Sequence, residues 1–497
     1  MEDEWTASAN EALTISLVRP SAATIENVSS FHPNFTYPIF GEDERIFGYK
    51  GLKINLQYDA RNLRPHLSIS SAKKFTTVGE VEATDIREIM KEFLPGVAFQ
   101  TRSEYENSIR DIQDTWTPPG ALVKTTEKNG ETYEIWRGTL ADPAVKQLIR
   151  RIQITALFFI EGGSYIGLDA DGNDAPEYSL ARWTVFFAYK KQAVPGAAEK
   201  YEYLFQGFST VYNFWMYQQS LPPNTGRENN APIQPRRDDS WELPQGDLDL
   251  ADFPCRARIS QFIILPPYQG KGVGALLYDT IFNLYIADAS TKEITVEDPN
   301  EDFDLLRDIC DLKYLRKNIS EFAALKVNSN MSIPEKGGFL HNNTQISPDN
   351  SAGSSTDGIV NMAKLREMRL KSKIAPRQFW RLVEMHLMSA LPASVRPQAD
   401  ADSMKPPAPK ADQRVYSLWR LLLKQRLYRR NVLILAELET TERIIKLNET
   451  VNNVEWEYAR ILERLEPRTS LNNGKRKTNG EADEDTPLSK KVRMNDI

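Results

Sequence analysis

The spacing of apolar residues divides the chain into strand-rich and helix-rich parts. Apolar and polar residues alternate over 13–18, 47–58 and 67–71, which predicts strands, and helical spacing follows over 84–93. Two long segments near the end of the chain, 362–391 and 413–465, also have helical spacing. We therefore expect an N-terminal α/β domain (1–130), a core (131–325) with an inserted loop (218–255), a linker (326–360), a helical C-terminal domain (361–466) and a disordered tail (467–497).

The core is expected to begin with a helix and to continue as a sheet. Apolar side chains cover a wide face of 143–161, which predicts one helix that Gly162 and Gly163 end. Consecutive antiparallel strands are predicted at 183–189, 201–206 and 208–217. The aromatic run at 212–217 is too dense for one buried face, so some of its rings must line a groove or contact a neighbour.

The rest of the core predicts a strand, a glycine turn, a helix and a second strand. A β-branched run over 259–265 stops at Pro266, which has no N–H group for a sheet hydrogen bond. Apolar residues then recur at helical spacing from Val273, and 293–296 alternates as a strand. A strand, helix and strand so close in sequence form a right-handed parallel βαβ unit.

Three glycines form the turn that opens this helix: Gly270, Gly272 and Gly274. They remove side chains that would keep a ligand off the backbone, and the first turn of a helix attracts phosphate. A Walker loop is excluded because Gly272, rather than Ser or Thr, follows Lys271. Three alternatives remain: a loose dinucleotide pattern G-x-G-x-x-A that ends at Ala275, a Q-x-x-G-x-G pattern that starts at Gln269, and a turn that only caps the helix.

The Q-x-x-G-x-G pattern resembles the coenzyme A pyrophosphate loop of the GNAT superfamily of N-acetyltransferases. Within that superfamily, the strings SQFIILPPYQGKGVGALLY and ITVEDPNEDFDLLRD resemble the catalytic subunits of the type B histone acetyltransferases, in particular the fungal ones. The resemblance implies an α/β fold with a mixed, mostly antiparallel sheet, a splayed parallel strand pair and a βαβ cofactor unit. It also implies direct, base-assisted transfer of acetyl from acetyl-CoA to lysine ε-amines on the tail of free, newly synthesised histone H-four.

The resemblance assigns roles to individual residues. Glu297, at the end of the second parallel strand, matches the general base, which is needed because free lysine, with a pKa of ~10.4, is protonated at neutral pH. Glu161 and Asp298 are alternates for this role. Cofactor contacts are expected from Phe262, Ile263, Ile264, Gln269, Gly270, Lys271, Gly272, Val273, Gly274, Ala275 and Asn300. Contacts with the histone tail are expected from Glu42, Asp43, Glu44, Trp183, Tyr212, Asn213 and Phe214, although the three acids also fit a solvated turn.

Composition narrows the remaining classes of protein. A net charge of −6 argues against direct nucleic-acid binding and suits a basic partner. Two cysteines and four dispersed histidines predict neither disulfides nor a metal site. No apolar run is long enough to span a membrane, and the N-terminus does not resemble a signal peptide, so we expect a soluble, non-secreted protein.

Partners and location are expected from the tail and from the resemblance. The usual companion of the family is a WD-repeat histone chaperone. Basic clusters at 475–477 and 490–493 resemble a bipartite nuclear signal, so we expect both cytoplasm and nucleus. Three other functions stay open: acetylation of a different amine, an inactive fold used only for binding, and a dinucleotide-dependent oxidoreductase.

Overall fold

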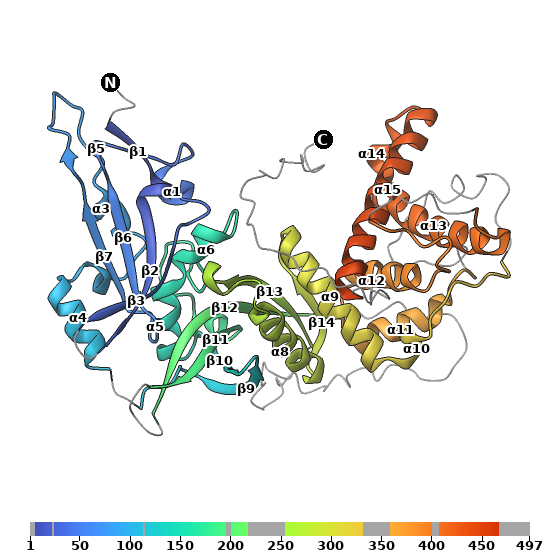
Figure 1. Ribbon diagram of the computed structural model, residues 1–497, viewed down its shortest axis with the longest axis horizontal. Coiled ribbons are helices and arrows are strands. Elements are labelled where there is room, and N and C mark those ends of the chain that lie inside the picture. Colours follow the sequence, from blue (N-terminus) through green and yellow to red (C-terminus); the bar gives the residue numbers. More distant parts are fainter. Residues whose placement is uncertain are drawn as a thin grey trace, which may run out of the picture.

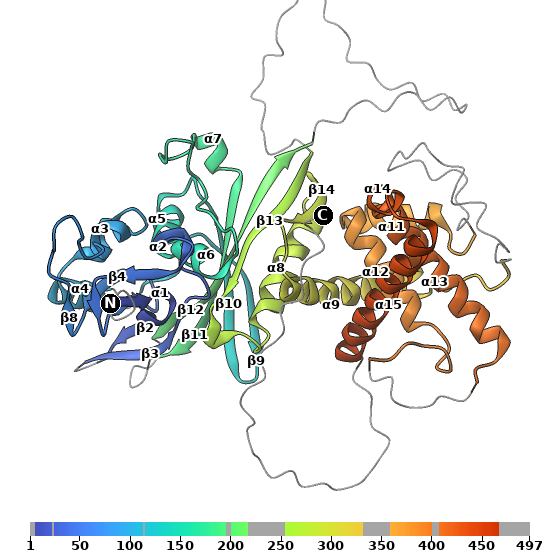
Figure 2. The ribbon, with the colours of Figure 1, turned by 90° about the horizontal axis from the view of Figure 1, so that it is seen from above.

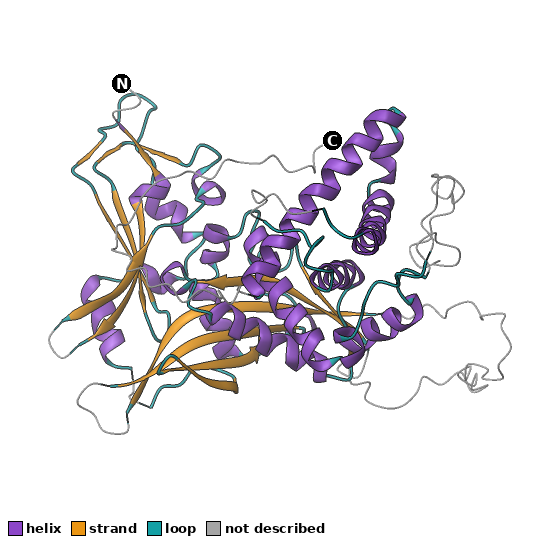
Figure 3. Cartoon of the chain, turned by 45° about the vertical axis from the view of Figure 1, so that its right-hand side comes forward, coloured by secondary structure: helices purple, strands orange, loops and turns teal. Residues whose placement is uncertain are grey.

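The structure is a computed structural model in which three regions lie side by side (Figure 1). A strand-rich N-terminal region lies at one end, a sheet in the centre and a helical bundle at the other end (Figure 3). The structure describes residues 5–21, 24–112, 115–194, 200–216, 254–331, 358–399 and 407–466. The predicted tail and most of the predicted inserted loop and linker lie outside these residues.

A six-stranded sheet forms the centre, in the order β14-β13-β12-β11-β10-β9. Its strands are β9 (Ala121–Lys128), β10 (Glu131–Thr139), β11 (Trp183–Ala193), β12 (Tyr201–Trp215), β13 (Cys255–Ile264) and β14 (Thr291–Val296). All neighbours are antiparallel except β13 and β14, which are parallel and joined through α8 (Val273–Ala287). This arrangement is the predicted fold class. The sheet begins at Ala121, ahead of the predicted domain boundary at residue 130, and β13 takes up the end of the predicted inserted loop at Cys255.

One long strand, β12, replaces two predicted strands. We expected the chain to turn at Gly207, but this residue pairs with Ile264 of β13 and with Ala188 of β11. A Cβ atom at this position would lie 2.3 Å from the carbonyl oxygen of Ile263. Glycine is therefore required here because a neighbouring strand comes very close, and not because the chain turns.

The N-terminal region is built on a four-stranded sheet in the order β3-β2-β6-β7. Its strands are β2 (Leu13–Pro20), β3 (Ile25–Phe31), β6 (Lys53–Asp59) and β7 (Pro65–Ser70), and two short pairs extend it: β1 (Thr6–Ser8) with β4 (Arg45–Phe47), and β5 (Tyr49–Lys50) with β8 (Lys73–Lys74). Its helices are α1 (Ala9–Ala12), α2 (Tyr37–Phe40), α3 (Ile86–Lys91) and α4 (Arg102–Arg110), with a 3-10 turn at Gly96–Phe99. Strands and a helix therefore form where the hydrophobic pattern predicts them, except that 47–58 is divided between three strands.

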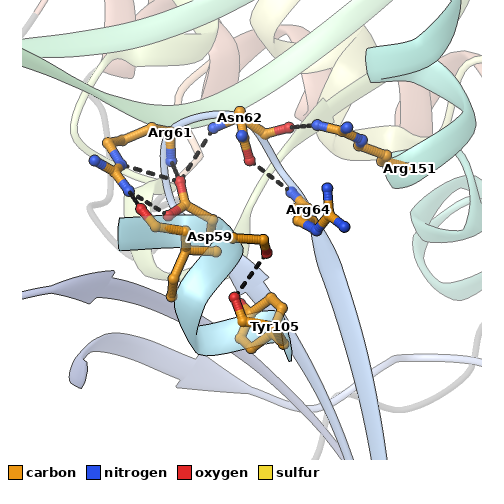
Figure 4. Close-up of polar contacts among 8 residues, drawn as sticks. Asp59, Arg61, Asn62, Arg64, Tyr105 and Arg151 are labelled. Carbon is orange, nitrogen blue, oxygen red and sulfur yellow. Dashed lines mark hydrogen bonds and ion pairs between the residues drawn. The ribbon is translucent and has the colours of Figure 1, made fainter. Parts of the chain in front are cut away.

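The turn between β6 and β7 fastens this region to the rest of the chain (Figure 4). The fully buried carboxylate of Asp59 accepts hydrogen bonds from the guanidinium of Arg61 at 2.7 and 3.1 Å, and from the N–H groups of Arg61 and Asn62. Arg61 also donates to the carbonyl oxygen of Ile109 in α4 at 2.7 Å. Arg151 donates to the carbonyl oxygen of Asn62 at 2.8 Å, so the turn joins two helices that are distant in sequence.

Two helices, α5 (Pro143–Ile152) and α6 (Ile154–Phe159), replace the single helix predicted up to Glu161. The break falls at Gln153, which ends α5 and begins α6. Residues 154–158 are all buried, and a change of direction gives them cover that one straight surface helix would not. Glu161 therefore lies beyond α6, in an exposed turn ahead of α7 (Glu177–Leu180).

The helical region follows β14. Its helices are α9 (Glu301–Asn318), α10 (Ser320–Ala323), α11 (Met362–Ser372), α12 (Pro376–Ser389), α13 (Lys410–Arg430), α14 (Val432–Ala436) and α15 (Thr440–Leu465). The two long helical segments predicted here are confirmed as helical, but each is divided. Helix α9 lies between the central sheet and the bundle, as the view from above shows (Figure 2).

The two faces of the central sheet belong to different hydrophobic cores. One core contains α8, α9 and the helical bundle, and the other contains α5, α6 and the N-terminal sheet. On β13, Ile259 belongs to the first core and Ile263 to the second, although their even spacing predicts a single face. Ser260 is the extra residue of a β-bulge opposite β12, and this insertion reverses the sides of the residues that follow.

Candidate active site

The parallel strands β13 and β14, at one edge of the six-stranded sheet, part beyond Ile259. Their last paired residues are Ile259 and Val296, and β13 continues to Ile264 without β14 beside it. The N–H group of Glu297 still donates to the carbonyl oxygen of Ile259 at 2.9 Å. Glu297 therefore lies where the two strands separate, as the splayed strand pair predicts.

Beyond this point, β13 has one unpaired edge. Leu265 donates its N–H to the carbonyl oxygen of Gln206, so the backbone groups of Ile263 face β12 as well. Those of Phe262 and Ile264 then face the open edge, where an extended ligand can pair as an added strand. The side chain of Gln269 donates to the carbonyl oxygen of Ile264 at 2.8 Å, which closes the glycine turn against the strand.

The glycine turn has the backbone that its sequence predicts. Gly270 and Gly272 have φ values of 71° and 82°, and Gly272 is the residue from which α8 begins. The first N–H groups of α8 belong to Val273, Gly274 and Ala275 and have no partner within the helix. Together with the positive end of the helix dipole they form a site that favours a phosphate group.

A lysine that sequence reasoning missed lies against this turn. A Cβ atom on Gly272 would lie 1.7 Å from the Nζ atom of Lys128, at the end of β9. An ammonium group beside the positive end of a helix is unfavourable unless an anion lies between them. In the sequence, Lys128 stands beside the hairpin signal Asn129-Gly130, but only the tertiary fold brings that hairpin to the glycine turn.

Two neighbours on β13 hold the carboxylate of Glu297. The hydroxyl of Ser260 donates to Oε2 at 2.5 Å, and a guanidinium nitrogen of Arg258 lies 3.3 Å from Oε1. The side chain of Glu297 is 42% exposed, so it is held and yet accessible. Sequence reasoning missed both partners. Arg258 and Ser260 are two residues apart, which is visible in the sequence, but the β-bulge at Ser260 has no signal in the sequence.

The other acidic candidates and Asn300 have different surroundings. Asp298 is exposed and has a φ of 31°, which is unusual for a residue other than glycine. Asn300 is the N-cap of α9, since its side-chain oxygen accepts from the N–H of Phe303 at 2.9 Å. The turn after Glu161 lies against β13, because Gln261 donates to the carbonyl oxygen of Ser164 at 2.7 Å.

The predicted peptide-contacting aromatic residues lie together. The ring of Tyr212 packs against Trp183, with centroids 4.8 Å apart, and against Phe214, at 4.7 Å. The guanidinium of Arg182 lies 4.8 Å from the Tyr212 ring, and its Nε donates to the carbonyl oxygen of Asn213. Phe214 is 37% exposed, so the cluster presents an aromatic surface on the strands that lead to Glu297.

The acids Glu42, Asp43 and Glu44 differ in how accessible their carboxylates are. Glu42 and Asp43 are exposed. The carboxylate of Glu44 accepts from the N–H of Thr36 at 2.6 Å and from Asn10 at 2.7 Å, so it stabilises the turn around α2. Of the three, the first two have carboxylates that are accessible to a ligand.

Cys255 and Cys310 are buried free thiols. Among the residues that the structure describes, no group of three or more His, Cys, Asp or Glu side chains is placed to hold a metal ion. Across the same residues, no helix combines the length and apolar character needed to cross a bilayer.

Comparisons with known proteins identify the family of this chain. Residues 5–161 match the family described as "Histone acetyl transferase HAT1 N-terminus", and residues 353–391 match "Fungal HAT1, C-terminal". Proteins described as "Histone acetyltransferase type B catalytic subunit" from Gibberella zeae and Pyricularia oryzae are 47% and 42% identical, over 100% and 99% of both chains. The chain belongs to this family of catalytic subunits. Family membership confirms the predicted resemblance and shows that the chain is an acetyltransferase enzyme.

A solved structure gives a more distant similarity. An aminoglycoside acetyltransferase from an uncultured soil metagenomic sample aligns with 41% of this chain and 97% of its own, at 17% identity and a TM-score of 0.20. The roles of individual residues in this type B catalytic subunit, and its domain boundaries, stay predictions.

Proposed function

We propose that this enzyme transfers acetyl from acetyl-CoA directly to lysine ε-amines on the tail of free, newly synthesised histone H-four, with Glu297 as the general base. The observation that carries the proposal is the position of Glu297, an accessible carboxylate at the point where β13 and β14 separate. The open edge of β13 begins at this point, and Arg258, which contacts Glu297, also lies 4.9 Å from the centroid of the Phe214 ring in the aromatic cluster.

A base at this position solves the main chemical problem of the reaction. A lysine amine with a pKa of ~10.4 has no free electron pair at neutral pH until a proton is removed. Ser260 and Arg258 fix the carboxylate of Glu297 while part of it faces solvent, so the carboxylate is oriented and an incoming ammonium group can reach it. The amine can then attack the thioester carbon, after which coenzyme A leaves as the thiol.

The cofactor is expected to lie along the open edge of β13 and across the start of α8. Backbone groups of Phe262 and Ile264 would pair with the pantetheine arm, and N–H groups of the glycine turn would bind the pyrophosphate. The ammonium of Lys128 lies where it would pair with the same phosphates. No metal is required for this chemistry.

The test is a comparison of Glu297→Gln with Glu301→Gln, an exposed acid at the start of α9. Glu297→Gln should bind acetyl-CoA normally in calorimetry but lose about 100-fold or more in kcat on an H-four tail peptide, the typical size of a general-base effect. Glu301→Gln should behave as wild type. Normal turnover by Glu297→Gln would exclude it as the base, and a matching loss in Glu161→Gln or Asp298→Asn would assign the role to that residue.

The proposal also covers the partners of the enzyme and its location in the cell. A histone tail is basic and extended, which suits the exposed acids Glu42 and Asp43 and the aromatic cluster. A WD-repeat histone chaperone is the proposed companion, and cytoplasm and nucleus are the proposed locations. Mass spectrometry of free core histones after incubation with the enzyme and acetyl-CoA would identify the lysine. Acetylation of other amines at a higher rate would refute the histone substrate.

A further inference from the structure

The junction between α11 and α12, residues 369–375, reaches the outer edge of the catalytic sheet. β14 is the last strand of that sheet. The N–H group of Ile294 in β14 donates to the carbonyl oxygen of Lys373 at 2.7 Å, and Ile294 and Ile374 form a parallel β-bridge. The helical region thereby covers a strand edge that carries the proposed base.

Lys373 ties the same junction to α8. Its ammonium donates to the carbonyl oxygens of Tyr285, Ile286 and Asp288 at 3.2, 2.7 and 2.6 Å. These carbonyls lie at the end of α8, where helical partners run out. The backbone of Lys373 is left-handed, with a φ of 53°, a conformation that costs about 1 kcal/mol or more outside glycine. Three hydrogen bonds from its ammonium group hold Lys373 in one position, and they offset the cost of its left-handed backbone.

Further contacts hold β14 from both of its edges. The carboxylate of Glu293 lies 3.6 Å from the guanidinium of Arg369 and 2.9 Å from that of Arg256. Ile374 is only 1% exposed and belongs to the same core as Ile294. The junction and β13 therefore contact β14 on its two opposite edges. Glu297 follows Ile294 by only three residues, so these contacts lie just before the proposed base.

We propose that Lys373 is a positioning residue for Glu297, through which the helical region sets the place of β14 at the reaction centre. The inference rests on the proposed role of Glu297. A displacement of a reacting group by about 1 Å can cost about 100-fold in rate, so a small shift of β14 lowers kcat. The glycine turn lies at the opposite end of α8 from the carbonyls that Lys373 holds, so acetyl-CoA binding stays intact.

The test uses the full-length chain with Lys373→Met, Lys373→Arg and, as a control, Lys371→Met at an exposed lysine two residues earlier. Lys373→Met should lower kcat about tenfold, with the Kd and KM for acetyl-CoA within about twofold of wild type. Lys373→Arg should recover at least half of the rate, and Lys371→Met should match wild type. A wild-type kcat in Lys373→Met would overturn the proposal, as would an equal loss of acetyl-CoA affinity.

Hydrogen exchange separates positioning from a general loss of stability. Amides of 294–297 should exchange faster in Lys373→Met, while those at the start of α8 keep their protection. A lower kcat with unchanged exchange in 294–297 would overturn the proposal. If Lys373→Met does not fold, Lys373→Gln takes its place with the same expected pattern. A wild-type chain that acetylates no histone peptide would refute the proposed function, whereas the exchange measurement would still report on the junction.

Discussion

The N-terminal region and the helical region pack on opposite faces of one sheet and bury their charges differently. The N-terminal attachment is the turn between β6 and β7. There a single carboxylate, that of Asp59, accepts a bidentate pair of hydrogen bonds from the guanidinium of Arg61 and two more from backbone N–H groups. At the helical attachment three carboxylates, those of Asp308, Asp311 and Glu384, are at most 1% exposed. The first attachment is one pair, whereas the second buries three acids on α9 and α12 with Arg307, Arg381 and Arg426 beside them.

Glu384 has its own arginine, since Arg426 lies 2.6 Å from its carboxylate, whereas Asp308 and Asp311 share the donor Gln378. Gln378 donates to Asp308 at 3.0 Å and to Asp311 at 3.2 Å, and Arg381 donates to Asp308 at 2.8 Å. Burial raises the pKa of Asp308 and Glu384, and it raises the pKa of Asp311 to about 6. The comparison teaches that a buried acid whose arginine lies 3.6 Å away, as Arg307 does from Asp311, makes one attachment sensitive to pH, while a bidentate arginine at 2.7 Å holds the other.

Breaking the N-terminal pair should have the largest effect. Arg61→Met leaves the buried carboxylate of Asp59 without its cation and should lower the free energy of unfolding by about 3–5 kcal/mol. Urea denaturation followed by circular dichroism measures this loss. Arg102→Met, which removes an exposed pair with Glu106 on α4, should cost only about 0.5 kcal/mol. Similar losses in the two variants would show that the attachment does not depend on the buried pair.

Asp311→Asn tests the pH sensitivity of the helical attachment. Since the folded pKa of Asp311 lies above its ordinary value of 3.8, keeping the carboxyl ionised becomes costly as pH rises through about 4 to 6. The asparagine variant does not bear this cost. Its stability relative to wild type should therefore improve by about 1–2 kcal/mol between pH 5 and pH 7.5. Thermal unfolding of both proteins at the two pH values measures the difference, and a constant difference would contradict the assignment.

Ser260→Ala addresses the residue at which β13 passes from one core to the other. Loss of the 2.5 Å hydrogen bond should free the carboxylate of Glu297 and lower kcat about fivefold, or roughly 1 kcal/mol. The KM for acetyl-CoA should not change, because the glycine turn is untouched. Ser260→Thr, which keeps the hydroxyl, should restore most of the rate. If the threonine variant is as slow as the alanine variant, the bulge geometry rather than the hydroxyl is what matters.

Lys128→Met should have the smallest effect, because this side chain is exposed and its charge is screened by solvent and salt. We expect the Kd for acetyl-CoA to rise about threefold at low salt, and less at high salt, as for one exposed ion pair. Lys124→Met, at another exposed lysine of β9, is the matched control. Calorimetric titration at two salt concentrations would detect the change. An unchanged Kd at low salt would place Lys128 outside the cofactor site.

Local pattern was sufficient for the elements that are close in sequence. The strand stopped by Pro266, the glycine turn and the start of α8 at Val273 all lie where the sequence predicts them. The position of Glu297 after β14 was likewise predicted, and its placement where the strands part was implied by the family resemblance. These features depend on proline and glycine chemistry and on hydrophobic periodicity, which act over a few residues.

Tertiary structure decided the features that join distant segments. The bulge at Ser260 reverses which side chains of β13 face each core, and the approach of Gly207 to Ile263 keeps β12 continuous. Chain packing brings Lys128 to the glycine turn and Lys373 to β14. None of these contacts has a local signal, because each depends on where a backbone far along the chain comes to lie.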